Sequence, residues 1–143
     1  MEKKIYTVDI EGKTLTATFT NLTNQAHGSV LMSQGETVVL VTAVMNKNTA
    51  TGMGYFPLSV EFEERFYATG QILGSRFQRR EGRPSEGAVL SARIVDRTIR
   101  PLFNQALRNE IQVIITVLSA GEDDPDVLGV IGASLALGVS DIP

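Results

Sequence analysis

The chain has 143 residues, of which 43% are hydrophobic and 20% charged, with a formal net charge of -3 and no cysteine. This balance is typical of a single folded domain, and the lack of cysteine excludes disulfides, thiolate nucleophiles and thiolate metal sites. Neither a secretory signal nor an apolar run of roughly 18 residues is visible, so we expect a cytoplasmic protein with no membrane partner.

The first half of the chain is predicted to form strands. Residues 4–19 alternate apolar and polar side chains around a central glycine turn, and a second glycine turn divides residues 28–45 into two strands. The later of these two, 37–45, is apolar nearly throughout, which is typical of a strand covered on both faces. Residues 58–66 alternate again, so a further strand is expected there.

The second half is predicted to contain two helices with a strand between them. Residues 67–84 are broken by glycines and a proline and are expected to be irregular. A helix then begins at the N-cap Ser85 and ends before Pro101, residues 111–118 form a buried strand, and Asp124 caps a second helix. Small residues make this second helix thin enough to pack closely on a sheet. Strands followed by helix, strand and helix predict a mixed sheet packed with helices, in an α+β or an α/β fold.

Arginines are concentrated in one segment of this acidic chain. Residues 76–100 hold seven of the nine arginines and only three acids, a formal charge of +4, so the remainder carries -7. Arginine offers a planar five-donor fork that suits phosphate and stacks on bases. A loop with Phe77 among arginines therefore combines a stacking surface with phosphate-binding groups, as single-stranded nucleic acid requires. The candidate residues for binding single-stranded nucleic acid are Phe77, Arg79, Arg80, Arg83, Arg93, Arg97 and Arg100.

Three of these arginines share one side of the first predicted helix. At 100° per residue, Arg93, Arg97 and Arg100 fall within about 60° of one another and form an exposed stripe. Asp96 is spaced to pair with either Arg93 or Arg100. The residues alone leave open an ordinary solvated helix face as the alternative. The side predicted to pack inward carries Ala88, Ser91, Ile94, Val95, Thr98, Ile99 and Leu102.

The other polar residues predict no catalytic group and no metal site. His27, the single histidine, is typical of a turn residue. Glu61 and Glu63 share a strand face and are expected to be solvated or paired with Arg65. The acidic residues in 122–126 lack the spacing of a calcium-binding loop and suit a turn and a helix start. The chain is therefore predicted to present an anion-binding surface without catalytic machinery.

Several segments resemble a known family. Residues 55–103 resemble the first core domain of the bacterial polynucleotide phosphorylase family, in the RNase PH superfamily, and the most specific runs are "REGRPSE" at 80–86 and "IRPLF" at 99–103. Further matching segments are 35–44, 108–119 and 126–143. The resemblance covers essentially all of residues 1–143 and implies one α+β domain of the RNase PH type, in which a mixed sheet and helices form two layers.

The resemblance implies a processive 3′-to-5′ exoribonuclease, a nucleotidyltransferase that uses inorganic phosphate and releases nucleoside diphosphates in a reversible reaction. It also implies a homotrimeric ring with a central channel, acting in RNA degradation with other proteins. The loop that contains Phe77, Arg79 and Arg80 then falls at a constriction on the RNA path, and the arginines of the first helix match family arginines that face RNA.

The family's phosphate-binding serines and Mg²⁺-binding aspartates belong to a second core. The resemblance therefore implies that these 143 residues are the first domain of a longer enzyme, inactive alone and without a metal ligand. One alternative is a single-core RNase PH or exosome-type subunit that trims tRNA, against which the run at 80–86 argues. Another is a non-enzymatic RNA-binding module.

Overall fold

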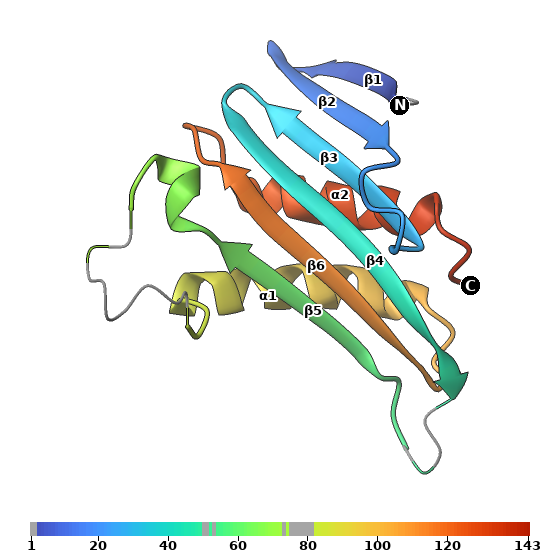
Figure 1. Ribbon diagram of the computed structural model, residues 1–143. Helices are drawn as coiled ribbons and strands as arrows, with labels where there is room; N and C mark the ends of the chain where they lie inside the picture. The colour runs from blue at the N-terminus through green and yellow to red at the C-terminus, as the bar shows by residue number, and fades with distance from the viewer. Residues whose placement is uncertain (1–2, 50–51, 53, 73, 75–81) are drawn as a thin grey trace.

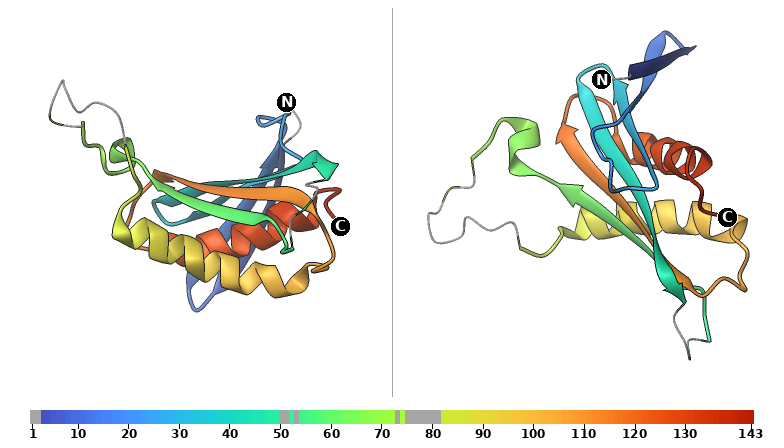
Figure 2. Two further views of the ribbon diagram at one scale, coloured as in Figure 1. Left: turned by 90° about the horizontal axis from the view of Figure 1, so that it is seen from below. Right: turned by 45° about the vertical axis from the view of Figure 1, so that its right-hand side comes forward.

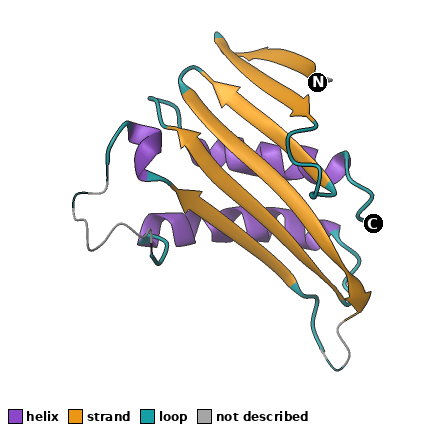
Figure 3. Cartoon of the chain, viewed as in Figure 1, coloured by secondary structure: helices purple, strands orange, loops and turns teal. Residues whose placement is uncertain are grey.

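A six-stranded mixed sheet forms one layer of the structure and two α-helices form the other (Figures 1 and 3). The computed structural model describes residues 3–49, 52, 54–72, 74 and 82–143. Both helices lie on the same face of the sheet (Figure 2). The predicted α+β class, a mixed sheet packed with helices, is confirmed.

The strands follow the order β1-β2-β3-β4-β6-β5 across the sheet. All neighbours are antiparallel except β5 and β6, which run parallel. A parallel pair needs a crossover connection, and α1 supplies it. The strands are β1 Lys3–Ile10, β2 Lys13–Thr20, β3 Gly28–Gln34, β4 Thr37–Thr49, β5 Leu58–Glu64 and β6 Asn109–Ser119. The helices are α1 Glu86–Ile99 and α2 Pro125–Gly138, with short 3₁₀ turns η1 Phe66–Thr69 and η2 Arg100–Leu102.

Both helices begin where their capping residues predict. The Ser85 hydroxyl accepts a hydrogen bond from the Ala88 amide at 3.0 Å, and the Asp124 carboxylate accepts one from the Asp126 amide at 2.9 Å. Pro125 occupies the first position of α2, where its missing amide proton is not needed. These side chains satisfy amides that have no partner within the helix.

We expect Ser85→Ala to lower the free energy of unfolding by about 1 kcal/mol, because it leaves the Ala88 amide without its acceptor. Urea denaturation of the purified chain measures the change. Ser134→Ala, on the exposed side of α2, is the matched control and should leave stability unchanged or slightly raised. Equal stabilities for the two variants would show that the cap contributes nothing.

The hydrophobic core lies between the sheet and the two helices. Alternate residues of the central strands point into it, as the two-residue period of a strand requires. Its fully buried members include Val39, Val41 and Ala43 of β4, Ile111, Val113 and Ile115 of β6, Val95 and Ile99 of α1, and Leu128, Ala133 and Ala136 of α2. Within the described residues, neither helix is long and apolar enough to cross a membrane.

The prediction that residues 37–45 are covered on both faces was wrong for this chain. Val39 and Val41 are fully buried under the helices, whereas Val38 and Leu40 on the opposite face are only partly buried. No helix of the described residues covers that face (Figure 2). A run of apolar residues therefore does not reveal how many faces of a strand a second layer covers.

The inward face of α1 is narrower than predicted. Ala88, Ser91, Val95 and Ile99 are buried as expected. The prediction was wrong for the remaining three positions, because Ile94 is 50% exposed, Leu102 is 81% exposed and Thr98 is also exposed. The buried strip of the helix lies toward one side of the predicted face, with Ile94 and Thr98 on the exposed side, and Leu102 follows the end of the helix in η2.

Candidate nucleic-acid interface

The predicted RNA-binding residues divide into three groups in the structure. Arg83, Arg93 and Arg97 are exposed, and Arg100 is partly buried. The described residues therefore place three of the predicted arginines where a large anion can reach them. Outside the described residues lie Phe77, Arg79 and Arg80.

Arg93 and Arg97 lie one helical turn apart on α1. Within the part of the chain that the structure describes, neither side chain has a hydrogen bond or an ion pair. Their spacing of four residues places them on the same face of the helix. Two guanidinium groups without protein partners on one face can each bind a phosphate of an extended polyanion.

A cleft of about 980 Å³ lies beside the N-terminal half of α1. Arg83 and Arg93 both line it, with the partly exposed ring of Phe66 from η1. Carboxylates line it as well, but Glu63 forms an ion pair with Arg65, as predicted, and Glu64 accepts a hydrogen bond from the Ser85 hydroxyl at 2.6 Å. The structure thus brings Arg83 and Arg93 to one cleft, whereas Arg97 is not among its lining residues.

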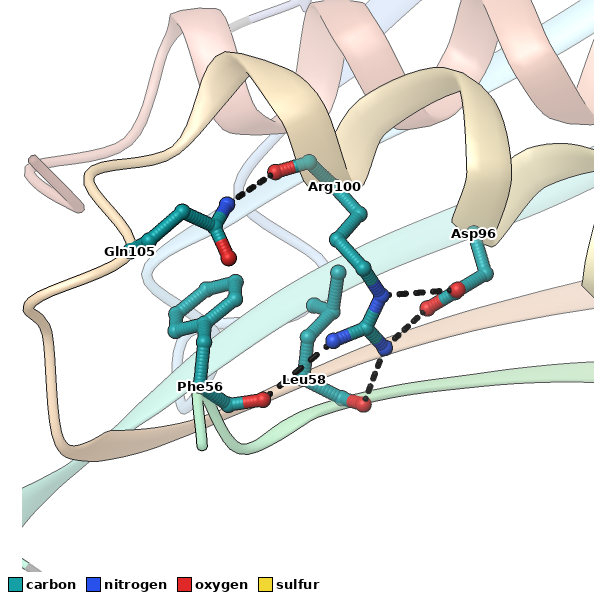
Figure 4. Close-up of polar contacts among 5 residues, drawn as sticks. All are labelled: Phe56, Leu58, Asp96, Arg100 and Gln105. Carbon is teal, nitrogen blue, oxygen red and sulfur yellow. Dashed lines mark hydrogen bonds and ion pairs between the residues drawn. The ribbon is translucent and has the colours of Figure 1, made fainter. Parts of the chain in front are cut away.

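Arg100 is held by protein groups and does not join the exposed stripe (Figure 4). Its Nε and Nη2 donate to the two carboxylate oxygens of Asp96, at 2.9 and 2.6 Å. Nη1 also donates to the Phe56 carbonyl at 3.2 Å and Nη2 to the Leu58 carbonyl at 3.0 Å. The hydrogen bond to Asp96 raises the pKa of Arg100, burial lowers it, and the charge of Asp96 raises it further. The prediction of three equivalent arginines is corrected to two exposed arginines and one that is internally bonded.

The position of Arg100 was missed because its partners are distant in the sequence. Asp96 was recognised as a possible partner from its spacing of four residues. The carbonyls of Phe56 and Leu58 precede Arg100 by 44 and 42 residues, and any residue type supplies a backbone carbonyl. No sequence signal could therefore identify them.

Three other polar residues considered in the sequence have structural partners. The Nδ1 atom of His27 accepts a hydrogen bond from the Met45 amide at 3.2 Å. Asp123 forms an ion pair with Lys13, and Asp124 caps α2. Among the described residues there is no group of three or more His, Cys, Asp or Glu side chains that could hold a metal ion. The described residues thus offer a Mg²⁺ ion no cluster of carboxylate ligands.

The sheet order, the helical layer and the arginine-bearing α1 agree with the RNase PH-type domain that the sequence resembles. Residues 11–143 match the 3′ exoribonuclease family, domain 1, and the chain belongs to this family. The resemblance inferred from the sequence is confirmed.

Two relatives and one solved structure illustrate this similarity. The polyribonucleotide nucleotidyltransferase of Heliobacterium modesticaldum is 52% identical over 141 residues, which cover 98% of this chain and 20% of that protein. The Thermomicrobium roseum protein of the same name is 56% identical over 137 residues, which cover 95% of this chain and 17% of that protein. A chain of the Archaeoglobus fulgidus exosome with RNA bound to the active site superposes with a TM-score of 0.64 at 21% identity, covering 99% of this chain and 52% of that one. The chain therefore spans about a fifth of the length of these curated relatives.

Proposed function

We propose that this chain is the first core domain of a polyribonucleotide nucleotidyltransferase, a phosphorolytic 3′-to-5′ exoribonuclease. The observation that carries the proposal is the pair of exposed arginines on α1, Arg93 and Arg97, which have no partner among the described residues, in a chain about half identical to proteins of that name. Guanidinium groups bind phosphate without reading the base, which suits an enzyme that must accept any RNA sequence.

The proposed reaction breaks the bond between the last phosphorus and the 3′ oxygen of the preceding nucleotide. Inorganic phosphate forms the new bond to that phosphorus, so the last nucleotide leaves as a nucleoside diphosphate. In this scheme Arg83, Arg93 and Arg97 hold RNA phosphates, and the loop that contains Phe77 stacks on a base. A second core in the same longer polypeptide binds the attacking phosphate and Mg²⁺. The whole enzyme is a cytoplasmic homotrimer that acts with other RNA-degrading proteins.

We expect the isolated 143-residue chain to release no ADP from poly(A) in the presence of phosphate and Mg²⁺. The full-length protein should release ADP, and the release should require phosphate. The reason is that the described residues of this chain contain no metal-binding cluster and no recognised nucleophile. Chromatography of the nucleotide products measures both results.

Two outcomes would contradict the proposal. Release of AMP in place of ADP by the full-length protein would show hydrolysis. Sustained ADP release that purifies with the isolated chain would show that this core is catalytic by itself. An open reading frame too short for a second core would favour the single-core alternative that trims tRNA.

A further inference from the structure

We propose that Arg100 is a positioning residue, which holds the end of α1 against the start of β5 and so orients Arg93 and Arg97 toward RNA. The inference rests on the proposed function, in which the exposed face of α1 contacts RNA. It assigns Arg100 a role different from the direct RNA contact that the sequence predicts.

Most N–H groups of the Arg100 guanidinium donate hydrogen bonds to protein acceptors (Figure 4). Two of its nitrogens bond Asp96 in a bidentate pair, a strong and directional arrangement. Two further bonds reach the carbonyls of Phe56 and Leu58, so four of the five N–H groups of an arginine are engaged. A phosphate would have to displace a carboxylate and leave backbone carbonyls without donors, which is unfavourable in a partly buried site.

Phe56, whose carbonyl accepts a hydrogen bond from Arg100, is itself fixed by packing. Phe56 is 4% exposed, and its ring lies 5.1 Å from the ring of Phe103, measured between centroids. The Arg100 guanidinium carbon lies 5.9 Å from the centroid of the Phe56 ring, within the range of a cation–π contact. The Gln105 side-chain amide donates to the Arg100 carbonyl at 2.9 Å. Both the backbone and the side chain of Arg100 are therefore tied to neighbouring segments.

This clamp, made of Asp96, Arg100 and the carbonyls of Phe56 and Leu58, acts at the end of α1. Arg97 lies about one helical turn before Arg100, and Arg93 lies about two turns before it. Because an α-helix is stiff over this length, the contact that anchors its end also sets the direction of its exposed face. Loss of the clamp should thus weaken RNA binding because Arg93 and Arg97 are oriented less well. Arg100 itself contributes no phosphate contact in this proposal.

The decisive variant is Arg100→Lys, because lysine keeps the positive charge but lacks the bidentate fork. We expect Arg100→Lys and Arg100→Ala each to lower the melting temperature of the 143-residue chain by about 5 °C. In phosphate-free buffer, both should weaken binding of single-stranded RNA severalfold, by the same factor at every salt concentration. Arg97→Ala is the matched control, which should reduce the slope of log K against log salt by about 0.7 and leave the melting temperature unchanged.

A second arm separates positioning from simple loss of stability. In a background that already carries Arg93→Ala and Arg97→Ala, Arg100→Ala should cause no further loss of RNA affinity, because the residues that it orients are gone. The same additional loss in both backgrounds would overturn the proposal. RNA binding that is unchanged in the folded Arg100→Lys protein would also overturn it, since Arg100 would then serve stability alone.

A direct RNA contact gives a different pattern. In that case Arg100→Ala would lower the salt slope by about 0.7 and Arg100→Lys would restore it. Should Arg100→Ala fail to fold, Asp96→Asn provides the test, because it weakens the clamp and frees the guanidinium. A positioning role predicts weaker RNA binding for Asp96→Asn, and a direct contact predicts equal or stronger binding.

Failure of the proposed function would be recognised separately. A wild-type protein that binds no RNA would refute that function and the positioning role together. The drop in melting temperature of Arg100→Lys would still report whether the clamp holds α1 to β5.

Discussion

Gly28→Ala is expected to lower the free energy of unfolding by about 3 kcal/mol or more. Gly28 is the first residue of β3 and is buried. A β-carbon at this position would lie 2.0 Å from the carbonyl oxygen of Ala136 and 2.9 Å from the β-carbon of Ser140. The first of these atoms belongs to the backbone of α2, so relief requires the helix to move away from the sheet. The reason for glycine here is space, because its φ is not in the left-handed region.

Gly138→Ala is the matched control for this prediction. Gly138 is the last residue of α2, and a β-carbon there would meet no atom within 4 Å. Alanine restricts the unfolded chain more than glycine does, so this variant should gain about 0.5 kcal/mol. Urea denaturation of both variants beside wild type measures the difference. A Gly28→Ala protein as stable as Gly138→Ala would mean that α2 does not approach β3 this closely.

Simultaneous replacement of Arg93 and Arg97 with alanine should reduce the salt slope of RNA binding by about 1.4, from roughly 0.7 for each single-strand phosphate contact. Between 50 and 200 mM salt, wild-type affinity should therefore fall about sevenfold more than that of the double variant. The change should be similar for poly(A) and poly(U), because phosphate contacts do not distinguish bases. Stability should be unaffected, since both side chains are exposed and have no partner within the described residues.

The matched control removes the same charge from the other edge of the sheet. Lys3 and Lys4 are exposed on β1, which lies at the opposite edge from β5, the strand on which α1 packs. A variant with both lysines replaced by alanine should keep the wild-type salt slope. Equal reductions of the salt slope in the two double variants would indicate a general effect of net charge. An unchanged salt slope in the arginine variant would show that the exposed side of α1 is an ordinary solvated helix face.

The sequence alone predicted the features that depend on neighbours along the chain. Ser85 and Asp124 begin their helices because a short polar side chain can accept from an amide two or three residues later. The glycines of α2 predicted close packing, and a β-carbon on Gly132 would lie 2.6 Å from Val41. The excess of arginine around α1 and the family resemblance were also visible without a structure. The capping signals depend on residues within one helical turn, the arginine excess depends on composition, and the resemblance depends on runs of matching residues along the chain.

Contacts between distant segments were decided by the tertiary structure alone. The helical periodicity of 100° per residue gives the direction in which each side chain leaves α1. It therefore predicted Arg93, Arg97 and Arg100 on the same side of the helix. This periodicity does not show how far a long side chain extends or which backbone carbonyls the fold places near it. Arg100 donates hydrogen bonds to the carbonyls of Phe56 and Leu58 and so does not join the exposed stripe. In the same way, the apolar run of β4 does not show which of its faces a second layer covers. The helices cover the face that carries Val39 and Val41, and Val38 and Leu40 on the other face are only partly buried, because burial depends on where α1 and α2 pack.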